Sequence, residues 1–254
     1  MKKITSIYLS FLFLAGLTIL SCGDNTPFEP PGGGNTGSGP ITGTDIPPIY
    51  ESFENDVTIT RDGNFIVLET KSVPQHRSPY FPEGHPNYVP YSGSNPDFAL
   101  GPYRLSEQNF VFRLPMEPTE ATNKVDAPTE DVIGLGVNGV VFYGVPNADD
   151  IDAIDSRNGH VDENGVYHYH LNPTYIIENV GKEGLVGMML DGYAIYGPEE
   201  NGVVVTSSDL DEFHGHVGAT FHEPDEIYHY HITYESPFIL GTKFFGTTGT
   251  VTNQ

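Results

Sequence analysis

Short apolar runs separated by turn-forming residues make up most of the chain beyond residue 49. Gly and Pro occur 29 and 21 times in 254 residues, and they leave few stretches long enough for a helix. The strands predicted from these runs cover residues 57–60, 65–70, 110–114, 137–143, 167–170, 188–195, 203–206, 228–234 and 238–245. Residues 148–155 are the best of the few helix candidates. We therefore expect an all-β fold, a sandwich or a distorted barrel with long loops, with an α+β fold as the alternative.

A stretch rich in Gly, Pro, Ser and Thr precedes these strands. Residues 23–48 contain almost no apolar side chains that a core could bury, so we expect a flexible tether there. No second stretch of this composition interrupts the rest of the chain. The sequence thus predicts one β domain over residues 49–254, preceded by a tether over residues 22–48.

The first 22 residues have the pattern of an export signal. Two lysines precede an apolar run over residues 4–20, which is a little short for a membrane span and ends in Ile19-Leu20-Ser21-Cys22. This ending resembles the lipobox of bacterial lipoproteins, which predicts a signal peptide over residues 1–21 and a lipid on Cys22. The expected location is the bacterial cell envelope, on the periplasmic or surface face of the outer membrane. An ordinary signal peptide that happens to contain a Cys is the alternative.

Charge and cysteine content limit the partners and the chemistry that we expect of the chain. Lys+Arg 11 against Asp+Glu 34 give a formal net charge of −23, which excludes a nucleic-acid binder that relies on a basic surface. An anionic lipid surface would repel such a chain, so we expect membrane attachment only through the N-terminal lipid, and leave a protein or glycan partner open. Cys22 is the only cysteine. The exported domain therefore has no disulfide, and its chemistry has to use His, carboxylates, Tyr, Ser/Thr or backbone.

Three sequence blocks occur twice, in the same order. The paired blocks are residues 138–144 with 191–197, 159–161 with 215–217, and 167–170 with 228–231. The first pair reads Asn-Gly-Val-Val-Phe-Tyr-Gly and Asp-Gly-Tyr-Ala-Ile-Tyr-Gly, the second Gly-His-Val in both copies, and the third Tyr-His-Tyr-His in both. The chain therefore contains two copies of one unit, about residues 136–170 and 189–231, which we expect to be related by a pseudo-twofold axis.

The Tyr-His-Tyr-His blocks place two histidines on one face of a strand and two tyrosines on the other, because alternate side chains of a strand point to opposite sides. Residues two apart in a strand have Cα atoms about 6.6 Å apart, close enough for both imidazoles to bind one metal ion. The Gly-His-Val of each copy supplies a third imidazole. The predicted ligands are His160, His168 and His170 in the first copy and His216, His229 and His231 in the second. Imidazole sites without thiolate suit copper or zinc.

Other candidates are weaker. His214, His222 and His85 lack the repeated spacing of the six predicted ligands. For any single histidine, the alternative is a surface position or a hydrogen bond in the core. The acidic stretches over residues 149–152 and 209–212 are expected to be solvated, with a calcium site as the alternative.

The duplicated motif and its flanking segments resemble a known family. The relevant segments are Pro74-Gln75-His76, Gly136-Val137-Asn138-Gly139-Val140, Gly159-His160-Val161, Leu190-Asp191-Gly192-Tyr193, Gly215-His216, Ser236-Pro237-Phe238 and both Tyr-His-Tyr-His blocks. This combination is similar to the YHYH-domain family, which is often found in exported bacterial proteins and has no established activity. The resemblance extends over most of residues 49–254 and implies a shared fold, but it names no reaction.

Two further points follow from the resemblance. Relatives often carry cysteines where this chain has Ser156-Arg157, Phe213 and Thr242-Lys243, so any disulfide bracing that the resemblance implies for them is absent here. His76 stands where the family pattern has Pro-x-His, which makes it a further candidate metal ligand or acid/base.

Three functions fit the sequence. The leading hypothesis is a lipid-anchored extracytoplasmic protein that binds a transition metal, copper or zinc, through the duplicated strands. The second is a metal-dependent extracytoplasmic enzyme, an oxidase or hydrolase, with Asp191, Asp211, Glu212 or His76 as acid or base. The third is a Tyr-rich binding module with structural histidines. Whether the two copies form one shared metal site or two separate ones is left open.

Overall fold

The computed structural model describes residues 41–42, 45–54 and 56–254. The predicted signal peptide, Cys22 and the tether up to residue 40 lie outside the described residues. Within the described part of the chain, no helix has both the length and the apolar character that a membrane crossing requires.

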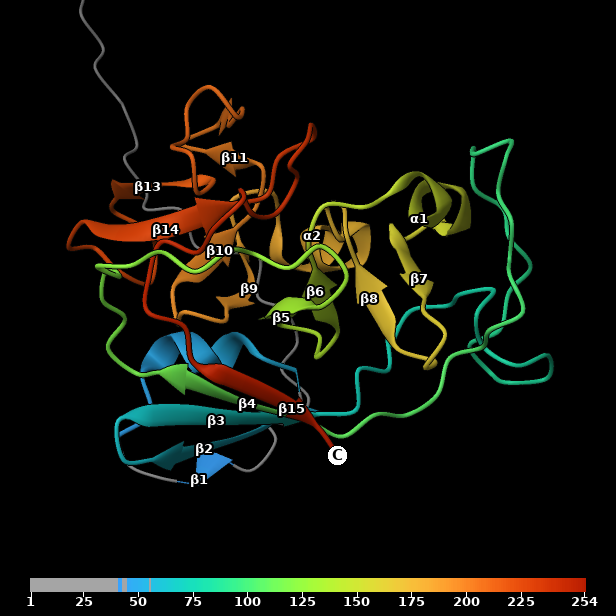
Figure 1. Cartoon of the computed structure of the whole chain (residues 1–254), viewed down its shortest axis with the longest axis horizontal. Coiled ribbons are helices and arrows are strands. Elements are labelled where there is room, and N and C mark those ends of the chain that lie inside the picture. Colours follow the sequence, from blue (N-terminus) through green and yellow to red (C-terminus); the bar gives the residue numbers. More distant parts are fainter. Residues whose placement is uncertain (1–40, 43–44, 55) are drawn as a thin grey trace, which may run out of the picture. The chain divides into compact units, whose positions relative to one another are not determined.

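A five-stranded sheet forms one layer of the fold (Figure 1). Its strands, in spatial order, are β1 (Ile41–Thr42), β2 (Thr58–Asp62), β3 (Phe65–Thr70), β4 (Phe110–Pro115) and β15 (Thr250–Asn253). All neighbouring pairs are antiparallel except β1 with β2. Phe110, Phe112 and Leu114 are buried and alternate with more exposed residues along β4, so one face of this sheet is turned toward the core.

An eight-stranded sheet carries both copies of the repeated unit. The first copy supplies β5 (Val132–Gly136), β6 (Val141–Tyr143), β8 (Tyr167–Tyr169) and β7 (Gly159–Val161), in spatial order from the centre outward. The second copy supplies β9 (Leu185–Met189), β10 (Ala194–Tyr196), β14 (Ile227–His231) and β13 (Gly215–Gly218). The centre is the antiparallel β5–β9 pair. In each half an antiparallel hairpin is followed by a parallel Tyr-His-Tyr-His strand and then by an antiparallel Gly-His-Val strand, so the two halves have the same topology.

The predicted strands over residues 137–143 and 188–195 are not continuous in the structure, because a tight turn interrupts each of them. Each of these segments contains a turn between two strands, β5 and β6 in the first copy and β9 and β10 in the second. Gly139 and Gly192 have φ angles of 76° and 84°, a region that glycine enters without steric cost. Asn-Gly and Asp-Gly are typical of two-residue hairpin turns. Apolar residues flank the Asn-Gly and Asp-Gly pairs on both sides, so the hydrophobic pattern looks like one continuous strand in each case.

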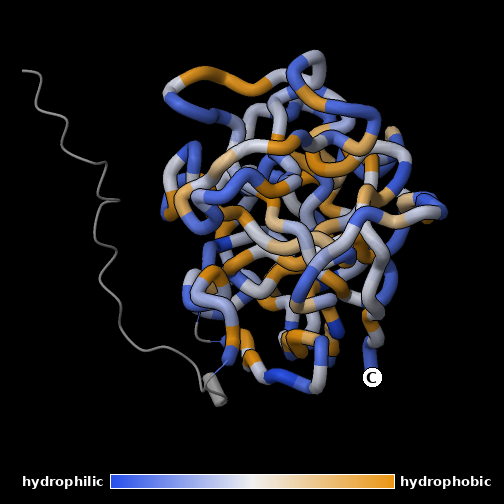
Figure 2. The backbone as a smooth tube through the Cα atoms, turned by 90° about the vertical axis from the view of Figure 1, so that its left-hand side faces the viewer, coloured by the Kyte–Doolittle hydropathy of each residue, from blue (hydrophilic) through white to orange (hydrophobic). Residues whose placement is uncertain are grey.

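Both turns lie against the five-stranded sheet. The Thr70 hydroxyl at the end of β3 donates a hydrogen bond of 2.6 Å to the Gly139 carbonyl, and a Cβ built at Gly192 would lie 2.5 Å from the Pro115 carbonyl oxygen. Buried side chains of both sheets form one core cluster, and Figure 2 shows hydrophobic segments running through the interior of this part of the chain. The fold is mostly β and sandwich-like, with no closed barrel among the described residues, which confirms the all-β prediction.

The remaining elements are short: η1 (Pro48–Ser52), α1 (Ala148–Ala153), α2 (Thr174–Val180), β11 (Glu199–Glu200) and β12 (Val203–Val204). Helix α1 lies within the predicted helix over residues 148–155. Helix α2 was not predicted, because its sequence is rich in the β-branched and aromatic residues that favour strands. Residues 238–245 do not form the predicted strand, and their buried side chains enter the core from an irregular segment.

Two candidate metal centres

The two histidines of each Tyr-His-Tyr-His block converge on a single point. The Nε2 atoms of His168 and His170 lie 3.0 Å apart, and those of His229 and His231 lie 3.1 Å apart. All four side chains are nearly inaccessible to solvent. The alternation of side chains along β8 and β14 therefore brings the two histidines of each motif together, as the sequence predicts.

Strand pairing brings the third histidine to each pair. In the first copy β7 runs antiparallel to β8 with His160 opposite His168, and the two rings have centroids 4.3 Å apart. In the second copy β13 pairs with β14 with His216 opposite His229, and their Nε2 atoms lie 3.1 Å apart. Each centre is thus a group of three imidazole nitrogens that all lie within 4.8 Å of one another.

Backbone carbonyls fix which ring nitrogen carries the proton. The Nδ1 atoms of His168 and His170 contact the carbonyls of Val166 and Gly144 at 3.0 and 2.5 Å, and in the second copy Nδ1 of His229 and His231 contacts the corresponding carbonyls at 3.2 and 2.8 Å. A carbonyl only accepts, so Nδ1–H donates and Nε2 holds a lone pair in the neutral ring.

The short Nε2–Nε2 distances within the His168–His170 and His229–His231 pairs are therefore not hydrogen bonds between neutral rings, because neither atom carries a proton. In addition, the buried Nε2 of His160 has no hydrogen-bond partner among the described residues. Two nitrogen ligands of a tetrahedral ion, with bonds of about 2.0–2.1 Å, lie about 3.3–3.4 Å apart, a few tenths of an ångström more than observed here. A metal ion fits the lone pairs that converge at each centre.

Burial keeps these imidazoles in the neutral form. Loss of hydration, together with a smaller effect of neighbouring imidazoles, lowers the pKa of His160 to about 3 and the pKa of His229 and His231 to about 4. Burial also lowers the pKa of His168 and His170. Neutral imidazole is the form that binds metal, so the ligands are ready to bind at neutral pH.

Each centre also has a carboxylate at its edge. Asp150 in helix α1 lies 3.7 Å from Nε2 of His160 and 3.8 Å from Nε2 of His170. Glu200 in β11 lies 3.7 Å from Nε2 of both His216 and His229. These carboxylates can serve as a fourth ligand or hold a water molecule on the ion.

Sequence reasoning assigned neither carboxylate to a metal centre with histidines. Asp150 lies in an acidic stretch that the sequence predicts to be solvated or to bind calcium, and no motif marks Glu200. A signal was present, because each carboxylate follows the repeated Tyr-Gly of its copy, Tyr143-Gly144 or Tyr196-Gly197, by a few residues. The spacing differs between the copies, however, so the repeat alignment does not pair the two residues.

The centres differ in exposure and lie far apart. The side chains of His160 and Asp150 are 7% and 12% exposed, whereas those of His216 and Glu200 are 26% and 31% exposed. Strands β8 and β14 are separated by five strand-to-strand steps in the sheet, which corresponds to about 24 Å at about 4.8 Å per step. The arrangement therefore supports two separate centres rather than one shared site.

The tyrosines of the motif point away from the imidazoles and anchor the strands. Tyr167 and Tyr228 donate to Asp155 and Asp211 at 3.0 and 2.9 Å, and Tyr230 donates to Asp191 at 2.6 Å. All four motif tyrosines are buried. The repeated motif thus combines a metal-facing side with a side that is hydrogen-bonded in the core.

The acid/base candidates and the remaining histidines lie outside the two centres. Asp191 and Asp211 accept these tyrosine hydrogen bonds, and Glu212 is exposed. His76, the seventh predicted ligand, is buried with its Nε2 2.9 Å from the Tyr169 hydroxyl. The other three histidines have contacts of their own: Nε2 of His214 with Thr233, Nδ1 of His222 with Tyr196, and the ring of His85 stacked on Phe81.

Comparison with known proteins identifies a family. The family model described as YHYH protein matches residues 111–201 and 198–244, just over half of the 254 residues. Each matched segment contains one Tyr-His-Tyr-His block. No curated protein and no solved structure matches the chain.

Proposed function

The chain belongs to the YHYH protein family, and from that premise we propose that it binds two transition-metal ions, copper or zinc, outside the cytoplasm while a lipid on Cys22 anchors it to the cell envelope. The observation that carries the metal assignment is the convergence of three imidazoles at each of two centres, where the Nε2 lone pairs of the two motif histidines face each other. Duplication of the whole arrangement, including the carbonyl acceptors on Nδ1, argues against a chance meeting of histidines.

The imidazole ligands limit which metals the two centres can bind. Imidazole suits copper, zinc, nickel and iron, whereas calcium and magnesium prefer oxygen ligands. Copper leads in the affinity order for divalent ions, and zinc suits a compact set of three imidazoles and one carboxylate. Copper and zinc are therefore the metals to supply first.

Metal analysis tests the proposal directly. The chain from Gly23 onward, which keeps every described residue, is purified without a metal-affinity tag, supplied with copper or zinc, and measured by mass spectrometry. We expect about two equivalents in this chain and about one each in His168→Ala/His170→Ala and His229→Ala/His231→Ala. His85→Ala is the matched control, because His85 lies outside both centres, and it should keep both ions. A chain that takes up neither metal contradicts the proposal.

The envelope location is supported by the N-terminal sequence and is tested separately. Full-length chain produced in a bacterium should be labelled by a radioactive fatty acid and should sediment with membranes. Cys22→Ser should abolish both the label and the sedimentation. Label that persists in Cys22→Ser would exclude Cys22 as the attachment point.

The exposure of the second centre favours a second candidate function, a metal-dependent oxidase or hydrolase. His216 and Glu200 lie partly open to solvent, so a substrate can approach an ion held there, and a bound ion would supply Lewis-acid or redox chemistry. Oxidation of a phenol or hydrolysis of an activated ester should then be lost in His229→Ala/His231→Ala and kept in His168→Ala/His170→Ala. Equal activity in both variants would exclude this function for the second centre.

The Tyr-rich binding module gains no support from the motif tyrosines. Because Tyr167, Tyr169, Tyr228 and Tyr230 are at most 5% exposed, they offer no contact surface. A binding surface of this kind would have to use other residues.

A further inference from the structure

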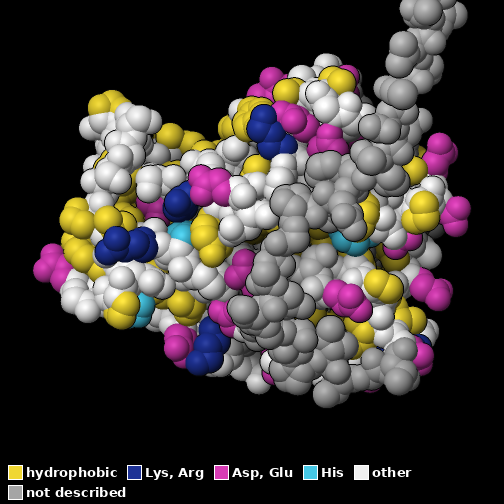
Figure 3. All heavy atoms as spheres, turned by 180° about the vertical axis from the view of Figure 1, so that it is seen from behind, with side chains coloured by type: hydrophobic (Ala, Val, Ile, Leu, Met, Phe, Trp, Pro, Cys, Tyr) yellow, Lys and Arg dark blue, Asp and Glu magenta, His cyan; other side chains and the backbone are white. Residues whose placement is uncertain are grey.

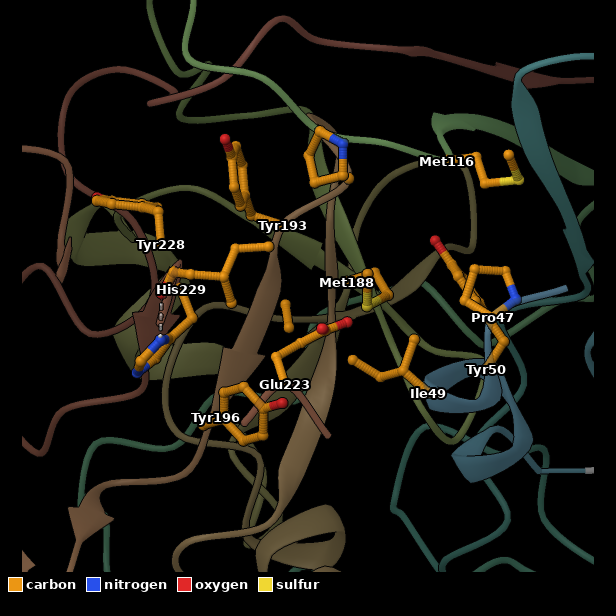
Figure 4. Close-up of a pocket in the computed structure, with 14 residues that line it drawn as sticks. Pro47, Ile49, Tyr50, Met116, Met188, Tyr193, Tyr196, Glu223, Tyr228 and His229 are labelled. Carbon is orange, nitrogen blue, oxygen red and sulfur yellow. Dashed lines mark hydrogen bonds between the residues drawn. The ribbon is translucent and has the colours of Figure 1, made fainter. Parts of the chain in front are cut away.

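A cavity of about 80 Å³ lies beside the second centre (Figure 4). Its buried walls include Tyr50, Met188, Tyr193, Tyr196 and Tyr228, and His229 also borders it. One water molecule needs about 10–15 Å³ of such space, so the cavity has room for a molecule of about five to eight heavy atoms.

One carboxylate enters this largely aromatic space. Glu223 is half-buried and lines the cavity, and in Figure 4 its side chain runs from near Tyr196 and its carboxylate ends beside Met188 and Ile49. The carboxylate makes no hydrogen bond or ion pair with any other described residue. None of the described lining residues is Lys or Arg. The cavity therefore contains a negative charge that the wall does not compensate.

The loop that carries Glu223 is fixed to the cavity wall. The Thr220 hydroxyl accepts from the Glu223 backbone N–H at 3.1 Å and lies 2.9 Å from the Tyr196 hydroxyl, and the Thr220 N–H donates to the Glu223 carbonyl at 2.8 Å. Burial, together with a smaller effect of the nearby Glu223 carboxylate, raises the pKa of Tyr196 to about 12. The carboxylate is thus held close to the aromatic wall.

A carboxylate within an aromatic and thioether-lined wall fits an organic cation better than any other small ligand. The face of a tyrosine ring attracts a cation, and methylated ammonium groups also gain from contact with apolar surface. A bare metal ion would find only one carboxylate here, because His229 directs its Nε2 to the second centre, and an anion would be repelled. The chain has 34 Asp+Glu against 11 Lys+Arg, and acidic side chains also outnumber basic ones on the face shown in Figure 3, which favours the approach of a cation.

We propose that this cavity binds a small organic ammonium ion, with Glu223 as its counter-ion and the surrounding tyrosines as its aromatic wall. The site does not depend on metal, so it goes beyond the proposed function. Because His229 borders the cavity and also belongs to the second centre, a bound ammonium ion would lie next to that centre.

Calorimetric titration tests the proposal with two probes of nearly the same shape. Choline carries a quaternary ammonium group, and 3,3-dimethyl-1-butanol replaces that nitrogen by carbon. Each is titrated at about 0.15 M salt into metal-depleted chain from Gly23 onward. We expect saturable choline binding at least tenfold tighter than binding of the neutral alcohol. Absence of saturable choline binding, or equal affinity for both probes, overturns the proposal.

Matched variants separate this cavity from general attraction to an acidic surface. Glu223→Gln should weaken choline binding about tenfold, whereas Glu226→Gln, an exposed carboxylate three residues away that does not line the cavity, should leave it unchanged. Tyr196→Leu should also weaken binding, since it removes an aromatic face. Equal weakening by Glu226→Gln and Glu223→Gln would overturn the assignment to this cavity. Metal content of the same proteins is measured separately, so that failure of one proposal is not mistaken for failure of the other.

Discussion

The first and second centres are built from equivalent sets of three imidazoles but differ in their access to solvent. In both, the strands of one sheet position the histidines with equivalent pairing. The segments that border them are not duplicated: helix α1 brings Asp150 to the first centre, and the β11–β12 hairpin brings Glu200 to the second. Ligand geometry therefore follows from the duplicated sheet, whereas exposure and the nearby carboxylate follow from the inserted segments.

The tyrosine sides of the two motifs differ as well. Tyr230 donates to the buried carboxylate of Asp191. Tyr169, its counterpart, lies 3.2 Å from the Asn138 amide nitrogen, which donates to it, and 2.9 Å from His76. The second half thus relies on a charged acceptor where the first half uses neutral partners, so the two halves should respond differently to substitution and to pH.

Removing the third imidazole should have the largest effect and should separate the centres cleanly. His160→Ala leaves the first centre with two imidazoles, and His216→Ala does the same to the second. Since loss of even an outer-shell partner costs 10–100-fold in metal affinity, we expect each variant to weaken its own centre by more than about 100-fold. Competition with a chelator of known affinity measures both values.

The other centre should be unaffected in each variant, because the strands that carry the two centres are separated by about 24 Å across the sheet. If His160→Ala also weakened the second centre by more than a few-fold, the centres would not be independent. Circular dichroism of both variants should confirm that the fold is kept.

Replacing the carboxylate at each centre should give the next largest effect on metal affinity. Glu200→Gln should weaken the second centre about 10–100-fold, because an amide is a poorer ligand and a poorer acceptor for metal-bound water. Asp150→Asn should weaken the first centre within the same range, and it should also cost about 1 kcal/mol of stability, since Asp150 completes the capping box of helix α1.

Chelator competition and urea unfolding measure these two effects side by side. Asp152→Asn is the control for the helix, because Asp152 belongs to the same acidic run but is exposed. If Asp150→Asn changed stability without any change in metal affinity, Asp150 would act only on the helix.

The histidine sets were predictable because they depend on local rules. Alternation along a strand places His168 beside His170, and repetition of the motif identifies the second set. The carboxylates were not predictable, since their approach depends on segments of different length and conformation in the two copies. The hairpin turns were missed because buried apolar residues flank Asn138-Gly139 as closely as they would in one continuous strand. The family resemblance drew attention to His76, but only the folded chain places it against Tyr169.

Asp191, the carboxylate that stands where the first half has Asn138, should add a pH-dependent contribution to the stability of the second half. Burial raises the pKa of Asp191 to about 6, above an unfolded value of about 3.9. The folded chain therefore holds the proton more tightly, and the stability from this group is complete below about pH 4 and lost as pH rises through about 6. The loss should reach at most about 3 kcal/mol.

Asp191→Asn, which copies Asn138 of the first half, should remove this contribution. The lowered pKa values of the buried histidines act in the opposite direction, because their contribution is lost as pH falls below about 6.5. The Asp191 contribution is therefore measured as the difference between the two proteins, both free of metal, in urea unfolding from pH 4 to 7. A difference that stays constant across this range would show that Asp191 does not titrate there.

The tyrosine anchors should give the smallest difference. Tyr230→Phe removes a hydrogen bond to a buried carboxylate, worth about 1.5–3 kcal/mol, and one from the Phe245 N–H, worth about 1 kcal/mol. Tyr169→Phe removes two bonds between neutral groups, each worth about 1 kcal/mol. At pH 7 the free energy of unfolding of the metal-free chain should therefore fall by about 1 kcal/mol more in Tyr230→Phe than in Tyr169→Phe. Tyr103→Phe, at an exposed tyrosine, should change stability little. A larger loss in Tyr169→Phe would mean that His76 and Asn138 hold their tyrosine more strongly than Asp191 does.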